Sequence, residues 1–234
     1  MREDICTIPI SEVFEPREGC PICRMRDTLE HRVTEYITGA AMMEPDVRVV
    51  TNRMGFCHDH FAMMLKKGSR LSNALILESH LKEIEDGIFL AGRSVPGKKQ
   101  VQAAQALEES CFVCERIEWA MTRMFDTIFR LWQQEEEFRA LYDEQPYLCL
   151  PHYTALMRAA EKGVRGKNAA PFAKATAALA HRCLKELEND VTHFCRMFDY
   201  RNNGGDWGNS KDAIERTIAF LTARAPGWNE KGKS

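Results

Sequence analysis

Residues 111–132 read CFVCERIEWAMTRMFDTIFRLW, a Cys-x-x-Cys pair that runs into apolar residues at helical spacing. The apolar positions advance in steps of three and four, from Val113 to Leu131. This spacing places them on one face of an amphipathic helix. The same pattern recurs over 172–198 and over 71–89. In the latter, the expected buried face holds Leu71, Leu75, Leu81, Ile84 and Ile88.

The segments between these helices do not favour a sheet. Glycine, proline and charged residues over 92–99 predict a linker. A final helix is expected near 210–223, with Asn209 or Ser210 as its N-cap. Only Val47–Val50 has a strand-like character, and it is short. We therefore expect an all-α helical bundle.

Composition indicates a globular protein. The chain has 234 residues, of which 44% are hydrophobic and 28% charged. It is long enough to form a buried core, and its composition differs from that of disordered chains. Lys and Arg number 32 against 34 Asp and Glu, and the formal charge of −2 argues against general nucleic-acid binding. No apolar run reaches the roughly 20 residues of a membrane span, and the N-terminus does not resemble a signal peptide. We expect a cytoplasmic protein with no membrane partner.

Two pairs of potential metal ligands occur twice along the chain. The Cys-x-x-Cys pair at 20–23 recurs 91 residues later at 111–114, and the Cys-x-x-His pair at 57–60 recurs 92 residues later at 149–152. Such self-similarity predicts an internal duplication.

The expected organisation follows from this repeat. One helical unit is expected at 1–95, and a second unit with the C-terminal helices at 100–225. The two are expected to form one compact domain, followed by a flexible tail at 226–234.

The repeated pairs predict one metal site in each half. Zinc favours four thiolate or imidazole ligands in a tetrahedron, and ligands three residues apart suit the first turn of a helix. Because four protein ligands would close each site, a structural zinc is expected rather than a catalytic one. The expected first set is Cys20, Cys23, Cys57 and His60, and the second is Cys111, Cys114, Cys149 and His152.

His58 and His60 both lie close to Cys57, so the sequence leaves a choice of ligand. The repeat favours His60, because its counterpart is His152, whereas position 150 is Leu.

The cysteines could also have roles other than zinc binding. Reduced cysteines often act as small hydrophobic residues, but chance does not explain the repeated register. An iron–sulfur cluster usually takes four thiolates, and each set offers three. A switching disulfide is a further alternative. The odd number of nine cysteines fits a fully paired disulfide framework poorly. Cys183 lies on the apolar face of its helix and is expected to be a core residue.

A chemically dense segment lies near the C-terminus. It could form a pocket for a polar or anionic ligand, or a partner site, at the start of the last helix. The alternative is a packed corner in which Trp207 covers the core and Arg201 pairs with Asp199 or Asp212. The candidate residues are Tyr200, Arg201, Asn202, Trp207, Lys211 and Asp212.

The duplicated Cys-x-x-Cys and Cys-x-x-His motifs, together with the FDYRN and WGxSKDA segments at 198–202 and 207–213, resemble an uncharacterised bacterial family of unknown function. The resemblance covers roughly residues 5–223. It implies a mostly helical bacterial cytoplasmic protein and no established activity.

The expected function is that of a zinc-stabilised helical binding or scaffold protein with two zinc ions. Its partner would be a protein or a small polar ligand. Two Zn²⁺ ions and six thiolates would change the formal charge from −2 to about −4, which further disfavours nucleic acid. A zinc–thiolate redox sensor and an enzyme that uses the C-terminal loop pocket are the alternatives.

Overall fold

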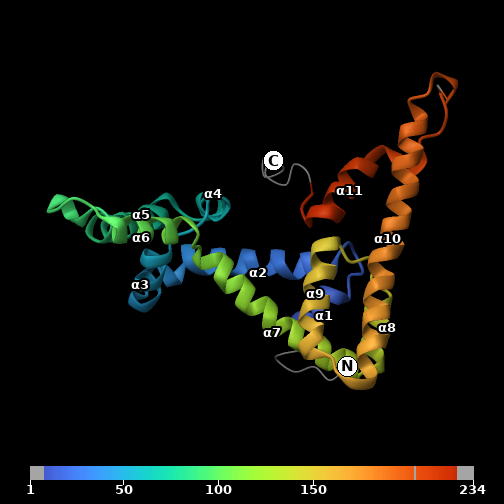
Figure 1. Ribbon diagram of the computed structural model, residues 1–234, viewed down its shortest axis with the longest axis horizontal. Coiled ribbons are helices and arrows are strands. Elements are labelled where there is room, and N and C mark those ends of the chain that lie inside the picture. Colours follow the sequence, from blue (N-terminus) through green and yellow to red (C-terminus); the bar gives the residue numbers. More distant parts are fainter. Residues whose placement is uncertain (1–7, 203, 226–234) are drawn as a thin grey trace. The chain divides into compact units, whose positions relative to one another are not determined.

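The computed structural model describes residues 8–202 and 204–225, in which every regular element is helical (Figure 1). The expected all-α fold is confirmed. Short 3₁₀ turns η1 to η5 separate some of the helices. The α-helices are α1 Ile8–Phe14, α2 Pro21–Thr38, α3 Pro45–Met54, α4 His58–Lys67, α5 Arg70–Gly87, α6 Lys98–Glu108, α7 Phe112–Gln134, α8 Glu136–Asp143, α9 Leu150–Gly163, α10 Ala169–Met197 and α11 Ala213–Thr222.

The chain divides into two compact units that differ from the expected halves 1–95 and 100–225. One unit takes up residues 26–121, and the other combines 1–25 with 122–234. We call them the inner and the outer unit, for their order along the chain. Both boundaries fall inside helices, within α2 and α7. Cys6 and the expected tail at 226–234 lie outside the described residues.

The outer unit has an aromatic core. Phe172 on α10 lies at its centre, with ring centroids 5.2–5.8 Å from those of Phe129, Trp132 and Tyr142. Phe14 on α1 packs against Tyr142 at 5.9 Å. All five side chains are buried. Helix α10 also contacts α9 and α11, so the apolar periodicity over 172–198 does mark a buried face.

Helix α5 in the inner unit does not bury the expected face. Leu71 and Leu81 are 68% and 61% exposed. The buried residues of α5 are instead Ser72, Asn73, Ile76 and His80.

Hydrogen bonds explain why polar side chains of α5 point inward. Asn73 Nδ2 donates to the carbonyl oxygens of Met64 and Ser69, and His80 Nδ1 lies 2.7 Å from the carbonyl oxygen of Asn52. These contacts satisfy the buried polar groups. Apolar periodicity therefore gave the wrong face, because it does not register polar side chains that find partners on α3 and α4.

Two local expectations are also corrected. Val47–Val50 is helical within α3, which begins with Pro45 and carries Asp46 in its first turn, both favourable at a helix N-terminus. The last α-helix begins at Ala213 with Asp212 as its N-cap, after a 3₁₀ turn. Ser210 is not the cap, because its hydroxyl donates to the carbonyl oxygen of Trp207 within that turn.

The aromatic core yields a stability prediction. The substitution Phe172→Ala should lower the free energy of unfolding by about 3–5 kcal/mol, because it removes a buried ring that contacts three others. Leu184→Ala on the same helix is the matched control, since Leu184 is 46% exposed, and it should cost about 0.5 kcal/mol or less. Chemical denaturation measures both, and equal effects would contradict the proposed core.

Candidate metal centres

All four ligand pairs lie at the beginning of a helix. Cys20 and Cys111 directly precede α2 and α7, and Cys57 and Cys149 are the N-caps of α4 and α9. In each pair the carbonyl oxygen of the first residue accepts a hydrogen bond from the backbone N–H four residues later. The second ligand therefore lies in the first helical turn, on the same side as the first. Helix N-termini also stabilise thiolates.

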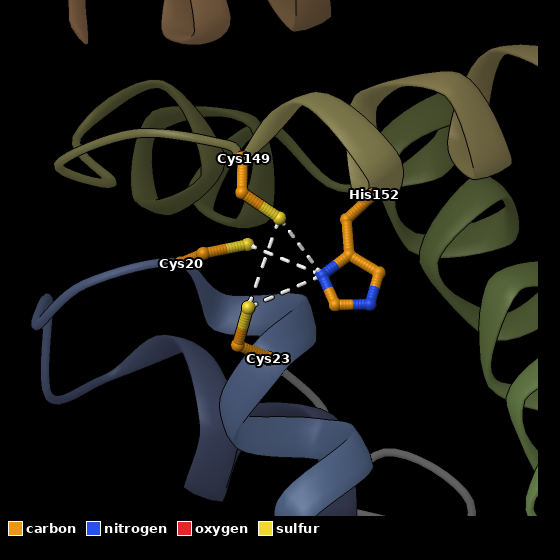
Figure 2. Close-up of side chains that lie close together, drawn as sticks. All are labelled: Cys20, Cys23, Cys149 and His152. Atoms are coloured by element: carbon orange, nitrogen blue, oxygen red, sulfur yellow. Dashed lines mark hydrogen bonds between the residues drawn. The ribbon is translucent and has the colours of Figure 1, made fainter. Parts of the chain in front are cut away.

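The first cluster joins the starts of α2 and α9 (Figure 2). His152 Nδ1 lies 3.1 Å from Cys149 Sγ, 3.3 Å from Cys23 Sγ and 3.7 Å from Cys20 Sγ. Cys23 Sγ and Cys149 Sγ are 3.7 Å apart. All but Cys23 are buried. We call this set the outer cluster, because it lies in the outer unit.

The second cluster joins the starts of α4 and α7. His60 Nδ1 lies 3.1 Å from Cys57 Sγ, 3.2 Å from Cys111 Sγ and 3.5 Å from Cys114 Sγ. His60 and Cys111 are buried, whereas Cys57 and Cys114 are half-buried. This set is the inner cluster, and it lies in the inner unit.

The clusters correct the expected grouping of ligands. We expected the pairs at 20–23 and 57–60 to share one site, and those at 111–114 and 149–152 to share another. Instead, each Cys-x-x-Cys pair meets the Cys-x-x-His pair of the other half. Each cluster still holds three thiols and one imidazole.

Backbone contacts explain the grouping in the inner unit. The Phe112 N–H donates to the Gly55 carbonyl oxygen at 3.0 Å, which brings the segment before Cys57 to the start of α7. Gly55 has a φ of +60°, and a Cβ there would lie 3.0 Å from the imidazole of His80. A side chain at this position would therefore disturb both the turn and the close contact between this segment and the start of α7.

A glutamine side chain has the corresponding role in the outer unit. Gln145 lies in the segment between α8 and α9, is buried, and donates from Nε2 to the Phe14 carbonyl oxygen at 2.7 Å. Its Oε1 accepts a hydrogen bond from Arg24, which also donates to the Val13 carbonyl oxygen. These contacts hold the segment before Cys149 close to the end of α1 and the start of α2.

The geometry of both clusters fits a tetrahedral metal ion. Bonds of about 2.3 Å to sulfur and about 2.0 Å to nitrogen separate neighbouring ligand atoms by about 3.5–3.8 Å. The contacts of the two clusters span 3.1–3.7 Å, and all four donor atoms of each lie within 4.8 Å of one another. Small outward shifts would accommodate the ion.

The pKa values of the three cysteines in the outer cluster are shifted in opposite directions. Burial opposes ionisation of Cys20, but hydrogen bonds from Cys149, Cys23 and His152 outweigh it and hold its pKa well below the usual value. Hydrogen bonding to Cys149 and Cys20 raises the pKa of Cys23, and hydrogen bonding to Cys20 raises that of Cys149 to about 12.

Two cysteines of the inner cluster likewise have pKa values shifted in opposite directions. Burial disfavours the Cys111 thiolate, but the hydrogen bond from His60 and two backbone N–H groups lower its pKa to about 6. Burial, followed by the charge of Cys111, raises the pKa of Cys114 to about 12. Burial also opposes protonation of His60, yet its contacts with Cys111 and Glu30 raise its pKa to about 10.

Two residues beside the clusters escaped the sequence analysis. Glu30 Oε1 on α2 lies 2.9 Å from His60 Nε2. Arg24 lies next to Cys23, where burial lowers its pKa and the charges of Cys20 and Cys23 oppose that effect. Nothing in the spacing of the motif points to Glu30, because it contacts a histidine 30 residues later in the sequence.

The remaining candidate ligands lie outside both clusters. His58 is exposed on the first turn of α4, so His60 is the histidine of the inner cluster. Cys183 is buried with Leu187 and Phe220, as expected for a core residue. Cys195 is exposed.

The C-terminal candidates form local pairs. Arg201 pairs with Asp199, and Asp212 pairs with Arg216. Asn202 Nδ2 donates to the Arg196 carbonyl oxygen.

The aromatic candidates and the lysine have different surroundings. Trp207 packs against Phe194 and Phe198, with ring centroids 5.5 and 5.6 Å apart. Tyr200 is 85% exposed, and Lys211 is also exposed. These contacts match a packed corner better than a pocket, and a ligand site here stays a prediction.

The fold and the clusters define an all-helical protein with two Cys₃His sets that could hold metal ions. The chain belongs to the family of unknown function DUF6062, whose model matches residues 1–227. Comparisons with curated proteins and with solved structures found no match. Among the described helices, none combines the length and apolar character that crossing a membrane requires.

Double substitutions distinguish the observed grouping from the grouping within each half. In protein loaded with Zn²⁺, Cys23→Ser with Cys149→Ser should remove about one metal ion per chain, because both thiols serve one cluster. Cys23→Ser with Cys57→Ser should remove both ions. Elemental mass spectrometry after gel filtration measures the difference, and Cys195→Ser is the control. The reverse order of losses would contradict the structure.

Proposed function

We propose that the protein is a zinc-stabilised helical binding or scaffold protein, in which each cluster holds one structural Zn²⁺. The observation that carries this proposal is the convergence of three thiols and one imidazole Nδ1 in each cluster, within 4.8 Å. Soft sulfur donors with one imidazole favour zinc over harder cations.

The donor set supports a structural role for the ion. Four protein ligands complete a tetrahedron, so no position is left for a substrate or an activated water. The eight ligands are Cys20, Cys23, Cys149 and His152 in the outer cluster, and Cys57, His60, Cys111 and Cys114 in the inner cluster.

The position of the ligands explains how zinc would stabilise each unit. In the outer cluster, sulfur atoms separated by 126 residues, those of Cys23 and Cys149, approach to 3.7 Å. Without a metal, neighbouring thiols in such a cluster have to share protons. A bound ion displaces these protons and links two helix starts to each other. The partner would be a protein or a small polar ligand.

Metal content tests this proposal. Protein purified without added metal should contain two zinc ions per chain by elemental mass spectrometry. Removal of zinc by a strong chelator should lower the thermal midpoint of unfolding and the helical circular dichroism signal, because binding free energy is folding free energy at such sites. Zinc added back should restore both. Fewer than two ions, or unchanged stability after complete removal, would contradict the proposal.

A further inference from the structure

The inner cluster differs from the outer one because its histidine is hydrogen-bonded to a carboxylate. Glu30 Oε1 accepts the hydrogen bond from His60 Nε2, and the two side chains are 14% and 3% exposed. Because Nε2 is bound to the carboxylate, Nδ1, which faces the thiols, is the ring nitrogen that would bind a metal after losing its proton. A carboxylate in this position also makes the imidazole a stronger electron donor. The matching position of the repeat, Met121, carries no charge.

A second difference lies directly after each Cys-x-x-Cys pair. Arg24 follows Cys23 in the outer cluster and interacts electrostatically with Cys20 and Cys23. Glu115 follows Cys114 in the inner cluster. Thiols that bind a metal are deprotonated in both clusters. A nearby cation such as Arg24 then lowers the electron density on sulfur, and the inner cluster has no cation directly after its second cysteine.

The third difference is access. In the inner cluster, Cys57 and Cys114 are both half-buried, and each is within hydrogen-bonding reach of the other. In the outer cluster only Cys23 is half-buried, while Cys20 and Cys149 are 3% and 1% exposed. Oxidation of cysteine follows thiolate character and exposure. The inner cluster therefore has two accessible, electron-rich sulfur atoms.

On the premise of the proposed function, that both clusters bind metal, we propose that the inner cluster is a redox-labile centre. Hydrogen peroxide oxidises Cys57 and Cys114 to a disulfide, and the ion leaves this cluster while the outer cluster keeps its own. The two Sγ atoms lie within 4.8 Å of each other, which is close enough for a second sulfur to capture the first oxidation product.

The chemistry balances with the peroxide as the only oxidant. One thiolate attacks a peroxide oxygen, the O–O bond breaks, and a sulfenic acid and hydroxide form. The second thiolate attacks the sulfenic sulfur, the S–S bond forms, and a second hydroxide leaves. Two protons from solvent convert both hydroxides to water. Two electrons pass from the two thiolates to the peroxide, and the metal loses two of its four ligands.

The disulfide would keep the inner unit joined after the ion has left. It links the start of α4 to the start of α7, as the metal does before oxidation. His60 and Cys111 would be freed from the ion.

The experiment uses the full chain with two zinc ions and measures release by a chromophoric chelator during treatment with hydrogen peroxide. We expect a fast phase of about one ion per chain, and peptide mapping should find a Cys57–Cys114 disulfide with Cys20, Cys23 and Cys149 still reduced. Metal analysis before the peroxide treatment tests the proposed function separately. A chain that holds fewer than two ions at that stage contradicts the proposed function and does not bear on the redox proposal.

The substitution Glu30→Gln tests the carboxylate. It keeps a hydrogen-bond acceptor near His60 but removes the charge, and it should slow the fast phase about threefold if thiolate basicity falls by about one unit, given a Brønsted coefficient of about 0.4–0.5. Glu35→Gln is the matched control on the same helix, since Glu35 pairs with Lys67 on the surface. This control should leave the rate unchanged.

Three results would overturn the inference. One is release of both ions in a single phase. Another is a first disulfide that contains a thiol of the outer cluster, or that joins Cys111 to Cys114. The third is a Glu30→Gln protein that binds two ions and loses the first as fast as the Glu35→Gln control. The disulfide map of the unsubstituted chain decides the question even if the Glu30 variant does not fold.

Discussion

In each cluster four potential donor atoms lie within 4.8 Å of one another, and a single ligand pair supplies only two of them. A helix start presents two donors on one side, so the other two must come from a second helix start. The structure meets this constraint twice, with α2 and α9 in the outer unit and with α4 and α7 in the inner unit. Within each unit, the path of the chain brings these two helix starts together.

Much of the fold could be predicted from local pattern, because amphipathic spacing is a property of one helix. The spacing located α7 and α10 well. It gave the wrong buried face for α5, where Asn73 and His80 turn inward to meet carbonyl oxygens of other segments. Partners of that kind lie far away in the sequence, and no periodicity describes them.

The ligands could be predicted by type and spacing, whereas their grouping could not. Spacers of 33, 50 and 34 residues separate the successive pairs, and all of them are long enough to allow either arrangement. The choice depends on tertiary contacts, such as the hydrogen bond from Phe112 to Gly55 and the contact of Gln145 with Phe14. Glu30 was missed for the same reason, because it reaches a histidine 30 residues away.

The two clusters are nested along the chain, and this has a consequence for synthesis on the ribosome. The inner cluster can be completed once residue 114 has emerged. Cys23, by contrast, has to wait for Cys149, 126 residues later, which takes roughly 6–25 s at about 5–20 residues per second. During that interval Cys57 and His60 offer the waiting thiols a complete but incorrect ligand set. A newly made chain that captures zinc too early would have to exchange ligands before it reaches the native pairing.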